Sequence, residues 1–161
     1  MLSSAQVQKI LEIAEGFYGT STDPEQIPIN KESFDKLMSL HQETIKLKTG
    51  IDGNPLSWVV VIPTSKEIMN LFLEGKITEK ELFDRAVVEK SFETLYLCSV
   101  FTVTKHRNKG LATELLLDSI KEFASDDSVQ LYAWIYSKEG ESLVNQLKKQ
   151  LGREIMTKIS R

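Results

Sequence analysis

The stretch 93–123, ETLYLCSVFTVTKHRNKGLATELLLDSIKEF, decides the expected fold of this chain. Its first part is an apolar run typical of a buried strand, and its last part has the apolar spacing of an amphipathic helix. Between them lies a short basic turn, Arg107–Ala112. Gly110 would let backbone N–H groups approach a ligand closely, and a helix that begins there presents unpaired amide donors. The sequence therefore predicts a phosphate-binding turn at a helix start.

The residues that precede this stretch predict two helices and a β-hairpin. Ser3 or Ser4 can cap the first helix, and Asn30 can cap the second. Residues 43–62 combine two strand-like runs with Asp-Gly-Asn-Pro turn chemistry between them, which favours a hairpin.

A helical insert is expected at 64–89, between the hairpin and the long strand. Each of its two helices would begin with a capping box, in which a hydroxyl and a carboxylate satisfy amide donors reciprocally. Thr64 with Glu67 would form the first box, and Thr78 with Glu81 the second.

The residues after the basic turn complete an alternation of helices and strands. A strand is expected at 129–136, followed by a helix that Ser137 caps and Gly152 ends, and by a short last strand at 155–159. We therefore expect a single domain over 1–161, of the α/β class, with a mixed sheet flanked by helices.

Composition narrows the classes of function. The net charge of −3 argues against a general nucleic-acid binder, and no apolar run approaches the ~20 residues that span a bilayer. Cys98 is the one cysteine, which excludes an intrachain disulfide and a multi-cysteine metal site. No metal site is expected, and the expected compartment is the cytoplasm. Cys98 itself is interpreted as a buried, inert thiol.

The basic turn resembles a known motif. In the GNAT-type N-acetyltransferases, a strand ending in Val is followed by Arg/Gln-x-x-Gly-x-Gly/Ala, which binds acetyl-CoA. Here Val103, Arg107, Gly110 and Ala112 occupy those positions. The order of elements is also similar to that family over most of the chain. The resemblance implies a GNAT-like fold, with a shortened C-terminal strand region, and acetyl-CoA as cofactor.

The resemblance also implies where the cofactor would lie. The pantetheine arm would pair with the strand backbone at Phe101, Thr102 and Val103, and Ser137 would contact the arm. The pyrophosphate would be surrounded by the residues of the turn and the helix start: Arg107, Asn108, Lys109, Gly110, Leu111, Ala112 and Thr113.

Acetyl transfer to a primary amine needs a base for the amine and an acid for the leaving thiolate. Glu93, at the start of the long strand, is the first candidate for the base. Many relatives carry a tyrosine acid in the last helix, four residues before its terminal glycine, where this chain has Lys148. Tyr136 and Tyr132 are the possible replacements.

Two alternative functions stay open at this point, together with the acceptor and the oligomeric state. The chain could be a degenerate acyl-CoA-binding or protein-interaction module without activity, or an α/β domain that binds another phosphate ligand such as a nucleotide. The acceptor, a small molecule or a protein amine, is not identified. Because the chain leaves room for one strand where relatives have two, a second copy or the inserted helices would complete that sheet edge, so a homodimer is possible.

Overall fold

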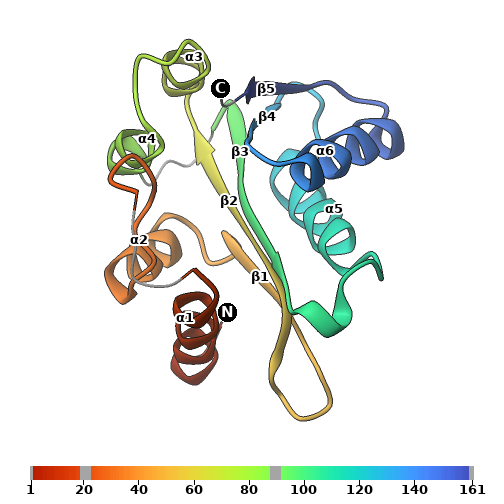
Figure 1. The fold of residues 1–161 in the computed structure, drawn as a ribbon. Helices are drawn as coiled ribbons and strands as arrows, with labels where there is room; N and C mark the ends of the chain where they lie inside the picture. The colour runs from red at the N-terminus through yellow and green to blue at the C-terminus, as the bar shows by residue number, and fades with distance from the viewer. Residues whose placement is uncertain (1, 19–22, 88–91, 160–161) are drawn as a thin grey trace.

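The computed structural model describes residues 2–18, 23–87 and 92–159, and Figure 1 shows their arrangement. The strands are β1 (Ile45–Thr49), β2 (Pro55–Thr64), β3 (Thr94–Thr102), β4 (Gln130–Ile135) and β5 (Ile155–Ile159). The helices are α1 (Ser4–Tyr18), α2 (Lys31–Leu40), α3 (Lys66–Leu73), α4 (Glu79–Arg85), α5 (Leu111–Ala124) and α6 (Lys138–Leu151), with a 3-10 helix, η1, at Thr104–His106.

The five strands form one mixed sheet in the order β1-β2-β3-β4-β5. The first three pair antiparallel, whereas β3 with β4 and β4 with β5 pair parallel. Parallel neighbours need crossover connections, and α5 and α6 supply them. The expected α/β class, with a mixed sheet flanked by helices, is confirmed.

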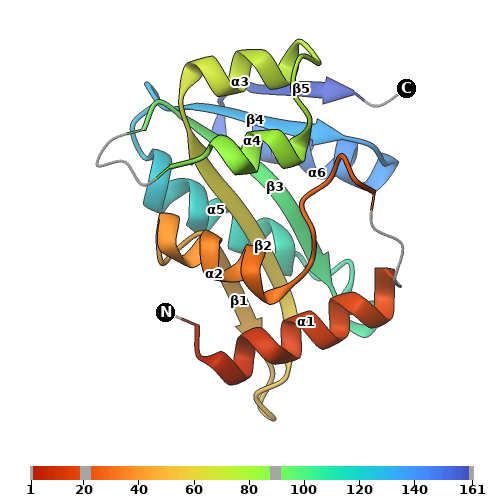
Figure 2. The same ribbon diagram turned by 90° about the vertical axis from the view of Figure 1, so that its left-hand side faces the viewer.

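Helices cover both faces of the sheet (Figures 1 and 2). α1 to α4 pack on one face, and α5 and α6 pack on the other. Each face has its own buried core. The core under α1 to α4 includes Phe72, Tyr96 and Tyr132, and the core under α5 and α6 includes Leu95 and Leu147.

Several local predictions are confirmed. The hairpin forms from β1 and β2. Asn30 caps α2 by accepting from the N–H of Ser33 at 2.9 Å. Thr78 and Glu81 form a reciprocal capping box at the start of α4, and Gly152 ends α6 in the left-handed region with φ 61°.

The capping box expected from Thr64 and Glu67 is wrong. β2 runs on through Thr64, and Ser65 caps α3 instead, by accepting from the N–H of Ile68 at 3.2 Å. Thr64 is buried, and its hydroxyl lies 2.7 Å from the hydroxyls of both Thr94 and Tyr132. The hydroxyl of Thr64 therefore makes tertiary hydrogen bonds, although its spacing from Glu67 had predicted a helix cap.

β5 lies at the end of the sheet order, with its carboxyl-terminal residues beside the inserted helix α3. The ammonium group of Lys158 lies 4.6 Å from the ring centroid of Phe72 on α3 and 5.0 Å from that of Trp134 on β4. Part of the insert therefore covers one face of β5. Among the described residues, no helix combines the length and the apolar character that crossing a membrane requires.

Candidate functional site

The pairing between β3 and β4 ends midway along the two strands. Their parallel register joins Thr94 with Gln130 and continues to Leu97 with Ala133, where it ends. β3 continues beyond that point to Thr102 beside β2, and β4 continues to Ile135 beside β5. Figure 2 shows the two strands diverging toward their carboxyl ends. Cys98–Thr102 of β3 and Trp134–Ile135 of β4 are therefore not paired with each other, and this parted region of the sheet is called the opening.

A β-bulge marks the start of this opening. Val60 of β2 opposes Ser99, but its neighbour Val61 opposes Leu97, so Cys98 is the extra residue. The exposure of the strands changes at the same step. Residues 94–97 and 131–133 are buried, whereas residues 98–100 and 134–135 are half-buried. The bulge therefore coincides with the point where the parallel pairing ends and several strand residues become half-buried.

Backbone groups of β3 alternate in direction along the opening. Val103 donates its N–H to the carbonyl of Leu56 at 2.9 Å, and the carbonyl of Phe101 accepts from the hydroxyl of Ser57 at 2.8 Å, so both face β2. By the alternation of an antiparallel ladder, the backbone groups of Val100 and Thr102 face the opening. A ligand that pairs with β3 here would therefore bind the backbone of Val100 and Thr102. Of the three residues expected to pair with the cofactor, only Thr102 has its backbone groups on this side, because those of Phe101 and Val103 face β2.

The basic turn lies directly after β3. Asn108 and Gly110 both have left-handed backbone angles, with φ of 63° and 77°, and a Cβ added at Gly110 would meet nothing within 4 Å. Gly110 is the N-cap of α5, and no side chain caps that helix. The first turn of α5 therefore has amide donors that no side chain caps, and uncapped amides at a helix start are the groups that bind anions.

The Arg107 side chain is hydrogen-bonded to the carboxyl end of β3. Its Nε donates to the carbonyl of Thr102 at 3.1 Å, which fixes the guanidinium beside the last residue of β3. Of the other expected cofactor residues, Asn108, Lys109 and Gly110 are exposed, Leu111 and Ala112 are half-buried, and Thr113 is buried. The turn thus brings cations and amide donors to one end of the opening.

Ser137 lies at the carboxyl end of β4, on the other side of the opening. Its hydroxyl accepts from the N–H of Gly140 at 3.0 Å and caps α6. Tyr136, next to it, is 58% exposed, and its ring lies 5.2 Å from that of Trp134. Tyr136 therefore has an exposed ring just beyond the end of β4, whereas Tyr132 is fully buried in the paired half of the strands.

The structure separates Glu93 from this site. Glu93 is exposed and precedes Thr94, at the amino end of β3, and its carbonyl accepts from the N–H of Gln130. Phe101 lies eight positions further along the chain, or about 26 Å in an extended strand. Lys148 lies in the last turn of α6, where its ammonium is 3.8 Å from Glu154. Neither side chain lies beside the opening.

A buried carboxylate that sequence reasoning missed lies at the bulge instead. Glu79, the first residue of α4, is 8% exposed. Its Oε1 accepts from the hydroxyl of Tyr96 at 2.7 Å and lies 3.7 Å from the Sγ of Cys98, and its Oε2 accepts from the N–H of Ile27 at 3.3 Å. These contacts span 17 to 52 positions of sequence, so no local pattern could have found them.

The pKa values of this cluster are shifted upward. Burial raises the pKa of Glu79, and the hydrogen bond from Tyr96 partly offsets that rise. Burial, with the nearby Glu79 carboxylate, also raises the pKa values of the Tyr96 phenol and the Cys98 thiol. Cys98 is therefore a neutral thiol. The Glu79 carboxyl group keeps its proton up to a higher pH than an exposed glutamate does.

Two cavities lie elsewhere. An open groove of about 350 Å³ lies between α1, β1 and α5, and a cavity of about 20 Å³ lies near Thr64 and Phe92, at the amino end of β3. In the part of the chain that the structure describes, no three His, Cys, Asp or Glu side chains are grouped to hold a metal ion.

No family model and no curated protein matches this chain. Among solved structures, it is similar to the crystal structure of a histone acetyltransferase HPA2 and related acetyltransferase from Corynebacterium glutamicum. The match has 19% identity and a TM-score of 0.47, and covers 91% of this chain and 80% of the other. Similarity at this level says nothing about substrate or catalysis in this chain.

Proposed function

We propose that this protein is an acetyltransferase that transfers an acetyl group from acetyl-CoA to a primary amine. The observation that carries the proposal is the parting of β3 and β4 beside the basic turn that opens α5. An extended thiol-ended arm needs strand backbone to pair with, and a pyrophosphate needs amide donors and cations. The opening supports the first requirement, and the turn at Arg107–Gly110 supports the second. The motif resemblance of that turn supports coenzyme A over other phosphate ligands.

The chain's own residues would divide the work along the opening. The amides at the start of α5, with Arg107 and Lys109, would hold the pyrophosphate. The backbone of Val100 and Thr102 would pair with the pantetheine arm, and an amide of this segment would donate to the thioester oxygen as it gains charge. Tyr136 would return a proton to the departing thiolate. The chemistry that acetyl-CoA supplies is an activated acyl group.

Titration calorimetry of the full chain with acetyl-CoA tests cofactor binding, with ATP as the comparison ligand. Gly110→Trp fills the open space over the turn, so we expect acetyl-CoA affinity to fall at least 100-fold. Gly75→Trp is the matched control, because Gly75 also has a left-handed φ, 74°, and open space around its Cβ position, but lies after α3. Equal affinity in the two variants, or binding of ATP and not of acetyl-CoA, would contradict the proposal.

Turnover is tested separately, by following thiol release from acetyl-CoA across a panel of primary amines and lysine peptides. We expect release that depends on the amine, with an acetylated product of matching mass.

A second candidate function is acyl-CoA binding without catalysis. It is favoured by the position of Lys148, which is paired with Glu154 at the far end of α6 and so supplies no acid at the opening. Tight acetyl-CoA binding with no acetylated amine from any acceptor would select this function over the first.

A further inference from the structure

We propose that Glu79, contributed by the α3–α4 insert, is the base that takes the proton from the acceptor amine, and that the acceptor enters the opening from the face of the sheet that α1 to α4 cover. This inference rests on the proposed acetyl transfer and names a catalytic residue for it.

The Glu79 side chain contacts β3 at the β-bulge, where the opening begins. It contacts Tyr96, whose backbone lies in the paired half of β3, and Cys98, the bulged residue that starts the parted half. The strand segments just beyond this step are the half-buried ones, 98–100 and 134–135. The carboxylate therefore lies at the inner end of the opening, on the opposite face from α5, whose start would hold the pyrophosphate.

The groups around Glu79 match the task of a base. The hydroxyl of Tyr96 and the N–H of Ile27 donate to its two oxygens and would hold the ionised carboxylate in place. The titratable groups that face it are Tyr96 and Cys98 on β3 and Lys158 on β5. Burial raises the pKa of Glu79, which brings a carboxyl group closer to the pH at which a base is most effective.

Aromatic rings lie beside the parted strands. The ring of Trp134 on β4 lies 5.2 Å from that of Tyr136, which follows β4, and 6.0 Å from that of Phe72 on α3. The chain's own Lys158 ammonium lies over the rings of Phe72 and Trp134. The ring of Tyr136, which is 58% exposed, is therefore the one that a protonated primary amine would meet first.

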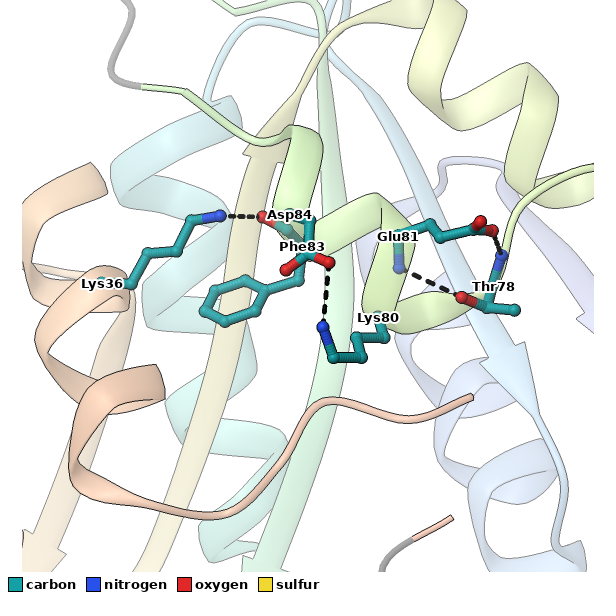
Figure 3. A network of polar contacts seen from close by, with 6 residues as sticks. All are labelled: Lys36, Thr78, Lys80, Glu81, Phe83 and Asp84. Atoms are coloured by element: carbon teal, nitrogen blue, oxygen red, sulfur yellow. Dashed lines mark hydrogen bonds and ion pairs between the residues drawn. The ribbon is translucent and has the colours of Figure 1, made fainter. Parts of the chain in front are cut away.

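The helix that carries Glu79 is held at both ends, as Figure 3 shows. At its start, Thr78 and Glu81 exchange hydrogen bonds of 2.8 and 3.1 Å. Toward its end, Lys36 of α2 donates to the carbonyl of Phe83 and lies 4.6 Å from the centroid of the Phe83 ring. A base must stay within hydrogen-bond reach of its proton, and this double attachment provides that rigidity.

The Glu79 carboxylate takes one proton from the ammonium group and passes it to solvent, and the neutral nitrogen attacks the thioester carbonyl. A C–N bond forms and the C–S bond breaks, so coenzyme A leaves as a thiolate. The attacking nitrogen loses its second proton to water, Tyr136 or water gives one proton to the thiolate, and solvent restores the proton of Tyr136. The products are an N-acetyl amine, free coenzyme A and one proton released to solvent.

The test compares Glu79→Gln with Glu67→Gln in the full chain. We expect Glu79→Gln to lower kcat at least 100-fold while acetyl-CoA affinity stays within 3-fold, since the amide keeps the shape but accepts no proton. Glu67→Gln, at an exposed position of α3 in the same insert, should retain kcat within 3-fold. If both variants keep wild-type kcat while the wild type acetylates amines, Glu79 is not the base and the proposed function still stands. If the wild type binds no acetyl-CoA, the proposed function itself fails.

A pH profile of Tyr96→Phe keeps the inference testable if Glu79→Gln does not fold. The wild-type kcat should rise with pH and level off once Glu79 is ionised. Losing the Tyr96 hydroxyl removes a hydrogen bond that holds the pKa of Glu79 down, so the midpoint of the profile should move to higher pH. A merely structural role would lower activity without moving the midpoint, and an unmoved midpoint would overturn the inference.

Discussion

The two halves of the β3–β4 pair are built differently, although the same two strands form both. In the first half, 94–97 pair with 130–133, the strands are buried almost throughout, and Thr64, Thr94 and Tyr132 join their hydroxyls across it. In the second half the strands part after the bulge at Cys98.

Because of this difference, one half of the strand pair would contribute to stability and the other to ligand binding. Paired backbone with buried side chains on both faces is core, and it has no donors left for a ligand. Backbone that leaves its neighbour must find another partner, and the opening directs the groups of Val100 and Thr102 toward the space where a ligand would lie. Changes in the first half should therefore act mainly on stability, and changes in the second mainly on binding and catalysis.

The largest expected contrast is between Leu95→Ala and Ile135→Ala. Leu95 is fully buried in the paired half, so its truncation should lower the free energy of unfolding by about 2–5 kcal/mol. Ile135 is half-buried in the parted half, and the same loss of volume should cost about 1 kcal/mol. Urea unfolding measures both, and equal costs would mean that the two halves do not differ in packing.

Thr64→Val tests the hydroxyl network of the paired half. The valine leaves the buried hydroxyl of Tyr132 without its Thr64 partner, so we expect a loss of about 1–2 kcal/mol in the free energy of unfolding. Adding Tyr132→Phe should cost little more, because both partners are then removed. Thr104→Val, at an exposed position of η1, is the control and should stay within about 0.5 kcal/mol of wild type.

Ser137→Ala and Ser65→Ala are a matched pair of helix-cap variants. Each serine accepts from an amide three residues on, and each alanine should cost about 1 kcal/mol in chemical denaturation. Because Ser137 borders the opening and Ser65 does not, only Ser137→Ala should also weaken acetyl-CoA binding. A loss of affinity shared by both variants would point to general destabilisation.

The smallest expected effect is a pH dependence of stability from Glu79. Its pKa in the folded chain lies above the ordinary 4.5, so its contribution to stability is fully present below 4.5 and is lost as pH rises through the folded pKa. Relative to wild type, Glu79→Gln should therefore become more stable as pH rises. Urea unfolding of both proteins from about pH 4 to 8 measures the difference, and a constant difference would contradict the upward shift.

The sequence predicted well where a structure depends on neighbours along the chain. Asn30, Thr78 and Ser137 cap helices as expected, because a cap needs only a side chain and an amide three residues later. The start of α5 at the basic turn is also as expected, with Gly110 as its N-cap. The basic turn at the start of α5, the best-defined part of the candidate site, was therefore visible before the structure.

Prediction failed where distant segments meet. Thr64 has the spacing of a cap, but its hydroxyl joins Thr94 and Tyr132 across two strand pairings. Glu93 lies next to the expected strand in sequence, yet the length of that strand carries it away from the opening. Glu79 is 17 residues from Tyr96, and only the docking of the insert on the sheet brings them together.

By itself, therefore, the sequence determined the order of helices and strands, the caps at Asn30, Thr78 and Ser137, and the basic turn at the start of α5, because hydrogen bonding over three or four residues fixes them. Only the tertiary structure decided where β3 and β4 part, that Cys98 is the bulged residue, and that Glu79 is the carboxylate at that point. Those features depend on strand register and on packing between segments far apart in the chain, and no local pattern encodes either.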